Sequence, residues 1–574
     1  MKVKDFFKNH WPITLIVLLA AALRLYALDR GDPISDEVLY GFRAIGMLDF
    51  DFAVVQPTPY QLFNITVPWW VHLSFHDHPI LVFLMQHWFM GLFGVNLWGL
   101  RLSSALFGIT SVFLIALLGE KLFSRKTGIA AAALFAVNVL MLYVSRTGVQ
   151  EAQVIFFMML TVYCFLRAEK EPRWYLATGA ALGLGLLSKY TIGFLVLPLG
   201  IAMLVWRRTD FKRWQLYAGA LILLAFCSPF IIYNFMLYRE FGHFDFQLFY
   251  IFGQKVSYWQ STPGKEIGSV GSRAAGIFGN LWAYHSNVLN VMAVAALLWC
   301  IARLARLKII TAELRRSLVF LLLLIASSVL LFLAIGPSPR FLSMLIPWLL
   351  LLIAAFFVAS FETVTKPVFR LAFIVFFVAL ISWETFFSYN SYIAYQPVGT
   401  ETIAYSRIHW DEHAWGFNRL DEMIGDVIKG KYPKYTIPYT YQFLEDVKTK
   451  SIQKAKAAGK QSAPYLFVYD DAQSDLATLW AVNRHSLYEG WPMIAADDFR
   501  QVVEEKGDGF YASQGFTDTY FIRATDKVLQ NHANRITDAG LWAEEFFKTQ
   551  KAEETSIRNH ASDEAFRWYH FNTQ

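Results

Sequence analysis

The chain has few of the residues from which soluble or disulfide-rich proteins are built. Only 17% of its 574 residues are charged, whereas soluble domains have about 25%. The three cysteines, Cys164, Cys227 and Cys300, all fall inside apolar runs, which excludes a disulfide framework and a zinc-binding cysteine spacing. The formal charge of +6 comes from short segments between apolar runs. A nucleic-acid-binding protein would carry a basic patch instead, so no nucleic acid is expected as a partner.

Apolar residues make up most of the chain. Hydrophobic residues account for 56% and aromatic residues for 17%, and the mean hydropathy is +0.37. Apolar runs of membrane-spanning length predict about eleven transmembrane helices. They lie at 12–28, 102–119, 129–144, 152–166, 175–188, 190–206, 215–235, 284–302, 318–335, 341–359 and 368–388. A further run, 79–94, contains Gln86, His87 and Trp88, and we expect an interfacial helix there, with a membrane span as the alternative.

The distribution of positive charge predicts the orientation. With the N-terminus in the cytoplasm, the predicted cytoplasmic segments carry about twice as many cations as the longer outer ones. Among these cations are Lys121, Arg167, Lys170 and Arg316. Arg24 interrupts the first apolar run and no small-residue cleavage site follows it, so we expect a retained helix rather than a signal peptide.

The chain becomes polar after about residue 389. A buried strand is predicted at 465–470, and helices at 474–485 and 497–506. The predicted organisation is therefore an all-α polytopic membrane domain, 1–389, with a long first outer loop, 29–101. A C-terminal α/β domain, 390–574, would follow outside the cytoplasm.

An acid pair, Asp36-Glu37, lies in the first outer loop and is followed by Tyr40. Most paired carboxylates in loops are simply solvated. Next to a membrane-embedded substrate, however, such a pair suits a general base and a metal or substrate contact.

Other polar residues are predicted on the same side of the membrane. They are Asp77, His78, Arg146, Glu151, Lys189, His243 and Arg340. Arginine and lysine there could hold a phosphate group, although cations at helix ends also reach to the interface without any ligand. His76-Asp77-His78 has the residue types of a divalent metal site. Adjacent residues seldom point toward one metal ion, so this segment is expected to supply two ligands rather than three.

The order of these motifs resembles that of the polytopic C-type glycosyltransferases that use polyprenyl-phosphate sugars, in the branch of protein O-mannosyltransferases and aminoarabinose transferases. Asp36-Glu37-x-x-Tyr40 is similar to the acid motif of the first loop, and Asp77-His78-Pro79 to the element that opens the interfacial helix. Ser145-Arg146 with Glu151, Ser188-Lys189-Tyr190 and Pro339-Arg340-Phe341 are similar to the later motifs. The resemblance spans roughly 12–360. The chain departs from the family at two of these positions. Pro79-Ile80 stands where the family has two prolines, and the acid of the second loop is Glu151 where Asp is common.

The resemblance implies a glycosyltransferase of the cell membrane that acts at the outer face with inversion. Asp36 would be the general base, with Glu37 and Glu151 as further catalytic residues. Lys189 and Arg340 would bind the donor phosphate, with Arg146 as a further candidate, and Tyr40 and His78 would contact substrate. Asp77 and His243 could hold a divalent metal ion, and activity without a metal is equally compatible.

The partners implied are a lipid-linked sugar donor and an acceptor that is a lipid, a glycan or a protein. The sequence does not indicate which sugar is moved or what the oligomeric state is.

Two other classes of function stay open. A transporter of lipid-linked glycans, or an accessory protein to one, would need ionisable residues inside its spans and on both faces. A membrane scaffold would leave the Asp36 motif unexplained.

Overall fold

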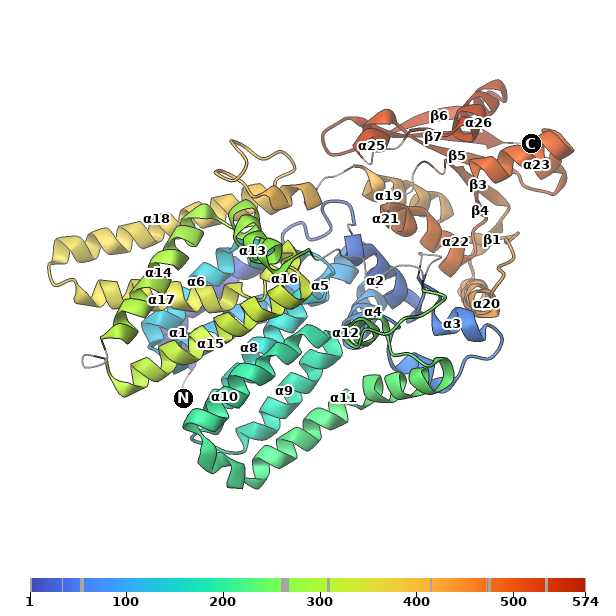
Figure 1. The fold of residues 1–574 in the computed structure, drawn as a ribbon. Helices are drawn as coiled ribbons and strands as arrows, with labels where there is room; N and C mark the ends of the chain where they lie inside the picture. The colour runs from blue at the N-terminus through green and yellow to red at the C-terminus, as the bar shows by residue number, and fades with distance from the viewer. Residues whose placement is uncertain are drawn as a thin grey trace. The chain divides into compact units, whose positions relative to one another are not determined.

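A computed structural model describes residues 3–33, 35–51, 56–259, 268–306, 310–412, 415–470, 472, 476–531 and 535–572. The chain divides into two compact units (Figure 1). The membrane unit combines residues 1–29 with 69–410, and the second unit combines residues 30–68 with 411–574. This division differs from the predicted boundary at residue 389 in two ways. Residues 390–410 pack with the membrane helices, and part of the first loop packs with the C-terminal domain.

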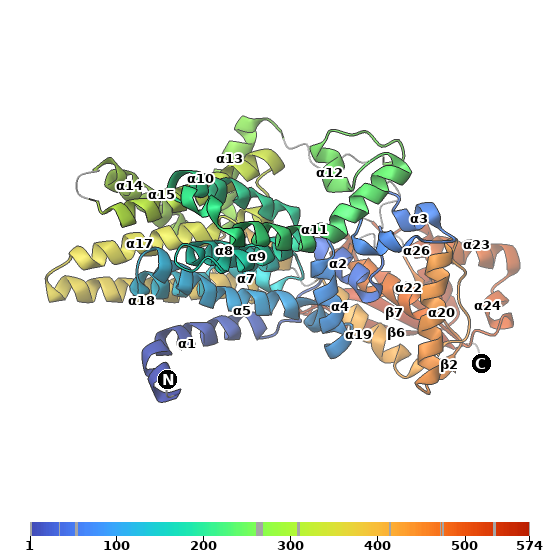
Figure 2. The same ribbon diagram turned by 90° about the horizontal axis from the view of Figure 1, so that it is seen from below.

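The described part of the membrane unit is helical. Its elements are α1 (Val3–Leu25), η1 (Trp69–Leu73), α4 (Leu81–Phe93), α5 (Leu97–Leu122), α6 (Arg125–Val137), α7 (Val139–Arg146), α8 (Glu151–Ala168), α9 (Trp174–Ser188), η2 (Tyr190–Leu195), α10 (Val196–Trp206), η3 (Arg208–Lys212), α11 (Trp214–Phe241), α12 (Phe246–Ile251), α13 (Val270–Tyr284), α14 (Asn287–Ala305), α15 (Ala312–Ile335), α16 (Pro339–Leu342), α17 (Ile346–Thr363) and α18 (Pro367–Tyr392). Figures 1 and 2 show α5, α8, α9 and α17 side by side, and α1 along one edge of this bundle.

Every apolar run predicted as a span is helical, but the predicted count of eleven spans is not confirmed. Among the described residues, seven helices are long and apolar enough to cross a membrane, and the bent pair α6 and α7 raises this number to eight. The predicted spans at 12–28, 175–188 and 190–206 correspond to shorter apolar helices, as does the run predicted as interfacial, which forms α4. An α-helix rises about 1.5 Å per residue. A helix of 15 residues such as α9 therefore covers only about 22 Å of the roughly 30 Å hydrocarbon layer.

Asn138 shapes the polar end of the bundle. It separates α6 from α7, whose axes differ by 59°, and its side-chain oxygen accepts a hydrogen bond from the Met141 amide at 3.2 Å. An asparagine at this position caps the new helix and satisfies an otherwise orphaned amide. The bend directs α7 so that it ends at Arg146, just before α8 begins at Glu151.

Glycines let α9 and α11 approach each other closely. A Cβ atom on Gly179 would lie 1.9 Å from the Gly219 carbonyl oxygen, and one on Gly219 would lie 2.3 Å from the Tyr175 carbonyl oxygen. Small residues at such crossings are a common packing device in membranes, where lipid competes for apolar side chains. This contact holds α9, and with it Lys189 at its end.

The second unit is built around a mixed sheet of order β4-β3-β5-β7-β6. Its strands are β3 (Tyr465–Tyr469), β4 (Met493–Ala495), β5 (Asp518–Ala524), β6 (Glu553–Arg558) and β7 (Glu564–Asn572). β3 pairs in parallel with β4 and β5, and β7 pairs antiparallel with β5 and β6. A separate parallel pair is formed by β1 (Lys431–Pro433) and β2 (Gln461–Ala463). The predicted buried strand and α/β character are confirmed.

Several helices pack on this sheet, and others complete the unit. They are α19 (Phe417–Ile428), α20 (Gln442–Ala457), α21 (Leu476–Thr478), η6 (Leu479–Asn483), α22 (Arg484–Glu489), α23 (Ala496–Lys506), α24 (Phe510–Ser513), α25 (Asp526–Asn531) and α26 (Asp538–Thr549). The predicted helix at 497–506 is α23. The one predicted at 474–485 corresponds to the run from α21 to α22, with positions 474 and 475 outside the described residues.

The first-loop segment belongs to this unit through specific contacts. Its helices are α2 (Ser35–Gly46) and α3 (Pro59–Phe63). The buried Asp32 carboxylate accepts hydrogen bonds from the backbone amides of Gly416 and Asn418, at 3.0 and 2.9 Å, at the start of α19. The Tyr488 hydroxyl donates to the Phe42 carbonyl at 2.7 Å, and the two rings lie 5.0 Å apart. The C-terminal domain therefore determines where α2 lies within the unit.

We expect Asp32→Ala to loosen this attachment, because it removes both hydrogen bonds and the negative charge at the start of α19. The loss should be about 1–2 kcal/mol. It would be measured as faster hydrogen exchange in residues 417–428 by mass spectrometry. Asp29→Ala, an exposed acid three residues earlier in the membrane unit, is the matched control. Equal exchange in both variants would contradict the assigned anchoring role.

Candidate active site

Glu151, Lys189 and Arg340 meet in the membrane unit. Lys189 Nζ lies 2.6 Å from Glu151 Oε1, and Arg340 Nε lies 3.2 Å from the same oxygen. The three side chains are 0%, 10% and 14% exposed, respectively. Water is thus largely excluded from this cluster, where electrostatic interactions are stronger than at an open surface. One carboxylate is shared by two cations, so the trio has a formal charge of +1.

Local sequence explains how each of the three residues is presented. Glu151 is the first residue of α8, where a negative charge is favoured by the helix dipole. Lys189 follows α9 in an extended conformation, with φ −167° and ψ 136°. Pro339 begins the short helix α16 after Ser338, and Arg340 is its second residue. The Phe341 ring centroid lies 4.5 Å from Lys189 Nζ and 5.7 Å from the Arg340 guanidinium carbon, so its face contributes cation–π attraction to both.

Arg146, another of the phosphate-binding candidates, contacts the end of α1. Its guanidinium donates to four backbone carbonyls at the end of α1, at 2.8 to 3.2 Å: those of Leu23, Arg24, Tyr26 and Ala27. The last carbonyls of a helix have no partner within the helix and carry partial negative charge. These contacts attach the end of α1 to α7, and the phosphate-binding role of Arg146 stays a prediction.

The acid pair lies in the second unit. Asp36 is the second residue of α2 and is half-buried, and Glu37 beside it is fully buried. The Tyr40 hydroxyl, one turn later, donates to Asp36 Oδ2 at 3.2 Å. Tyr40 of the first-loop acid motif therefore contacts Asp36 directly. This hydrogen bond orients the Asp36 carboxylate.

Asp77 and His78 are neighbours in the loop before α4. His78 Nδ1 lies 3.0 Å from Asp77 Oδ2, and His76 Nδ1 lies 3.8 Å from Asp77 Oδ1. Imidazole nitrogens and carboxylate oxygens are ligands that divalent metal ions take in proteins. Asp77 and His76 offer two donors of this kind, and the metal-binding role of Asp77 stays a prediction.

His243 is placed differently. Its Nδ1 contacts the Phe244 carbonyl at 2.7 Å, and its Nε2 contacts the Tyr258 hydroxyl. Its ring packs against Trp259, with centroids 4.5 Å apart, and burial lowers the histidine pKa below its usual value. Both ring nitrogens contact protein groups, and the metal-binding role of His243 stays a prediction.

A second polar cluster next to Lys189 was not predicted. The buried Asp245 carboxylate accepts from the Tyr190 hydroxyl and the Asn234 amide, each at 2.8 Å, and caps α12 through two backbone amides. Burial raises the pKa of Asp245, while these donors act in the opposite direction. Tyr190 directly follows Lys189, so this cluster fixes the turn that presents the lysine. Asp245 lies 55 residues after Tyr190 in the sequence. The only signal in the sequence is that aspartate is a common helix-capping residue.

We expect Glu151→Gln to destabilise the membrane unit, because it leaves two largely buried cations without their carboxylate. Loss of one partner from a buried ion pair costs about 3–5 kcal/mol. The midpoint of thermal unfolding would be measured for the protein in detergent, with tryptophan fluorescence as the signal.

Glu169→Gln is the control, since Glu169 follows the other end of α8 and forms an ion pair with the partly exposed Arg316. That change should cost less than about 1 kcal/mol. Equal midpoints for the two variants would show that the Glu151 cluster does not stabilise the fold.

Known proteins share features with this chain. Residues 77–233 match the family model of dolichyl-phosphate-mannose-protein mannosyltransferases. The structure of ArnT from Cupriavidus metallidurans bound to undecaprenyl phosphate is similar over 98% of both chains, with a TM-score of 0.53 and 12% identity. The oligosaccharyltransferase AglB from Archaeoglobus fulgidus, in complex with an inhibitory peptide and a dolichol-phosphate, matches 90% of this chain and 70% of its own, with a TM-score of 0.48 and 14% identity. No curated protein sequence matches the chain. The likeness to ArnT confirms the predicted fold class, a helical membrane domain with a strand-containing C-terminal domain.

Proposed function

We propose that the chain is an integral membrane glycosyltransferase. It transfers a sugar from a polyprenyl-phosphate donor to an acceptor hydroxyl or phosphate at the outer face of the cell membrane. The observation that carries this proposal is the largely buried pair of cations, Lys189 and Arg340, held on Glu151. The match of residues 77–233 to a family of mannosyltransferases and the undecaprenyl phosphate bound by ArnT support the choice of donor class.

The donor phosphate would bind at Lys189 and Arg340. Arginine offers a planar fork of donors that matches phosphate oxygens, and lysine offers a compact charge beside it. Glu151 holds both cations in place before substrate arrives, so little reorganisation is needed when the bond to the sugar breaks. The same carboxylate could orient the donor sugar.

Asp36 would act as the general base. Its carboxylate takes the proton from the acceptor hydroxyl while the acceptor oxygen attacks the anomeric carbon on the face opposite the phosphate. The bond between that carbon and the phosphate oxygen breaks, and its electron pair leaves with the polyprenyl phosphate. Transfer therefore inverts the anomeric configuration. The leaving group is already an anion, so it needs charge stabilisation rather than a general acid.

The remaining predicted site residues have supporting roles in this scheme. Tyr40 orients Asp36 by its hydrogen bond, and Glu37 and His78 are candidates for substrate contacts. A divalent ion, if the enzyme uses one, would be held by Asp77 with His76 beside it, and would supply positive charge to the donor phosphate. The acceptor would be selected by the second unit, because α2 and the C-terminal domain belong to the same compact unit.

We expect Asp36→Asn to lower turnover by about 10²–10⁴-fold, the usual contribution of a general base, with the protein still folded. Membranes containing each variant would be supplied with radiolabelled polyprenyl-phosphate sugars, and label transfer or release would be measured. Asp29→Asn should behave as the wild type. Full turnover by Asp36→Asn would exclude Asp36 as the base and redirect the assignment to Glu37.

We expect Arg340→Lys to keep the positive charge but lose the planar fork, so donor use should fall more than fold stability does. A bidentate contact to a charged group is worth about 1.5–3 kcal/mol, which corresponds to roughly a 10- to 100-fold fall in kcat/KM for the donor. Arg273→Lys, at a backbone-binding arginine of α13, is the control. An unchanged kcat/KM for Arg340→Lys would place the phosphate elsewhere.

A further inference from the structure

A polar cavity lies at the end of α8 that is farthest from Glu151. It has a volume of about 530 Å³ and is formed by the ends of α5, α8 and α10 and the beginning of α15. Glu151 begins α8 and Arg167 lies in its last turn, so the two polar regions are about 25 Å apart along this helix. The cavity is thus separate from the site proposed for sugar transfer.

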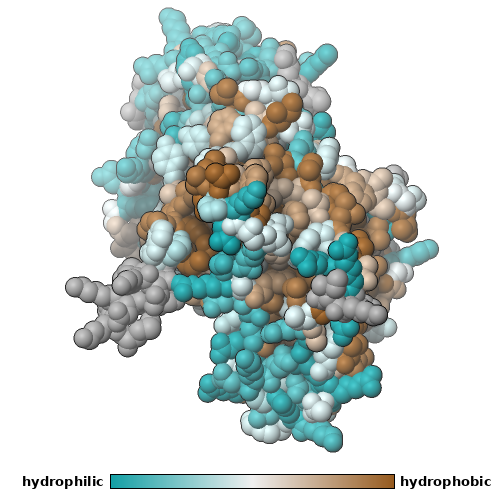
Figure 3. All heavy atoms as spheres, turned by 90° about the vertical axis from the view of Figure 1, so that its left-hand side faces the viewer, coloured by the Kyte–Doolittle hydropathy of each residue, from teal (hydrophilic) through white to brown (hydrophobic). Residues whose placement is uncertain are grey.

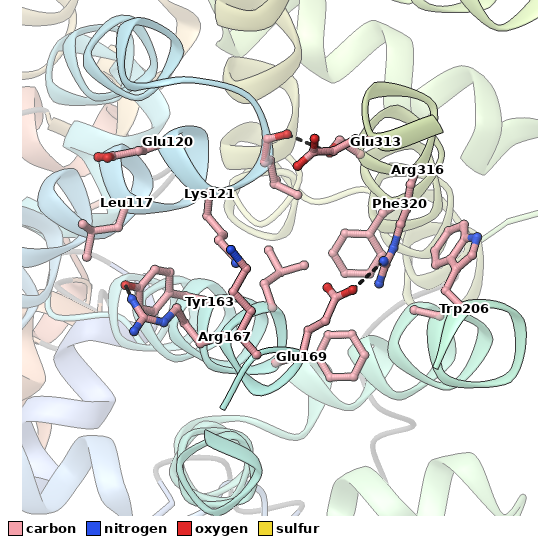
Figure 4. Close-up of a pocket in the computed structure, with 16 residues that line it drawn as sticks. Leu117, Glu120, Lys121, Tyr163, Arg167, Glu169, Trp206, Glu313, Arg316 and Phe320 are labelled. Carbon is pink, nitrogen blue, oxygen red and sulfur yellow. Dashed lines mark hydrogen bonds and ion pairs between the residues drawn. The ribbon is translucent and has the colours of Figure 1, made fainter. Parts of the chain in front are cut away.

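Four cations line this cavity: Lys121, Arg167, Lys170 and Arg316. Figure 4 shows Lys121 extending from α5 into the middle of the cavity, with Arg316 and Glu169 on the opposite wall. Among the described residues, the side chains of Lys121 and Lys170 form neither a hydrogen bond nor an ion pair. Two ammonium groups facing one cavity repel each other, and an anion between them would relieve that repulsion.

Among the described residues, the acids of the cavity form no ion pair with these two lysines. Glu169 is engaged with Arg316 at 2.7 Å. Glu120 and Glu313 are exposed and lie along the same edge of the view in Figure 4. The acids therefore occupy the rim and the far wall, and the lysines are left to meet a ligand.

The walls of the cavity favour a lipid over a soluble anion. Trp206 and Tyr163 line it, with the Arg316 guanidinium carbon 5.6 Å from the Trp206 ring centroid. Tryptophan and tyrosine are typical of the level of lipid headgroups. Leu117 and Phe320 continue the lining toward the interior of α5 and α15. Figure 3 looks onto this end of the helices and shows hydrophilic side chains set among hydrophobic ones.

We propose that this cavity binds the headgroup of an anionic membrane phospholipid. The lipid phosphate lies between Lys121 and Lys170, and the beginning of an acyl chain lies against Leu117 and Phe320. Basic pockets between transmembrane helices are a known means of holding anionic lipid headgroups. A cavity of 530 Å³ is also within the usual range of small-molecule sites, about 300–1,000 Å³.

The test is native mass spectrometry of the full chain in detergent, titrated with phosphatidylglycerol and, separately, with phosphatidylcholine. We expect the wild type to retain one phosphatidylglycerol in preference to phosphatidylcholine. The Lys121→Ala/Lys170→Ala double variant should bind it at least about tenfold more weakly, because two charge-assisted contacts are lost. The Arg125→Ala/Lys126→Ala double variant removes the same charge from exposed positions beside the cavity and should bind as the wild type does.

Three results would overturn the proposal. Equal retention of both lipids would remove the anionic preference, and equal weakening in both double variants would indicate nonspecific surface charge. Displacement of the lipid by millimolar inorganic phosphate would identify a site for free phosphate instead of a lipid. The thermal midpoint of each variant, measured in lipid-free detergent, shows whether it is folded. A Lys121→Arg/Lys170→Arg variant keeps both positive charges and should bind phosphatidylglycerol as the wild type does.

Discussion

The membrane unit depends on one constraint, which is that charged groups within the bundle must be paired with other groups of the protein. Glu151 meets this constraint for two cations at once, and in doing so it ties together the beginning of α8, the end of α9 and the short helix α16. Arg146 meets it in another way, by filling the carbonyl positions that the end of α1 leaves open. These two residues are only five positions apart. Together they connect five helical elements around the turn between α7 and α8.

This arrangement suggests how stability and chemistry are combined. A carboxylate that holds two cations in fixed positions is costly to bury, and its lost hydration is compensated only by good geometry. In return the cations are preorganised, which is the property that a phosphate-binding site needs. The Asp245 cluster adds rigidity, because Tyr190 is held immediately beside Lys189. The same contacts thus keep the bundle together and prepare the proposed donor site.

The second unit shows that a loop in the sequence can be part of a domain in space. Residues 30–68 interrupt the membrane unit, yet Asp32 and Phe42 bond to the C-terminal domain. The proposed general base, Asp36, is carried by α2 of this unit. Changes in the C-terminal domain can therefore reach the acid pair without any change in the membrane helices, which offers a physical route by which acceptor recognition and catalysis could be linked.

The sequence by itself determined the class of protein, the positions of the apolar helices, the strand-containing C-terminal domain and the residue types suited to phosphate and proton transfer. These properties follow from composition and local periodicity, which are read directly along the chain. The tertiary structure decided which of the candidates meet. It joined Glu151 to Lys189 and Arg340, turned Arg146 toward α1, occupied both nitrogens of His243, and assigned part of the first loop to the C-terminal unit. Such pairings depend on the packing and hydrogen bonding of segments far apart in sequence. Local hydropathy and charge do not encode those contacts, so the sequence could name the candidates but could not choose their partners.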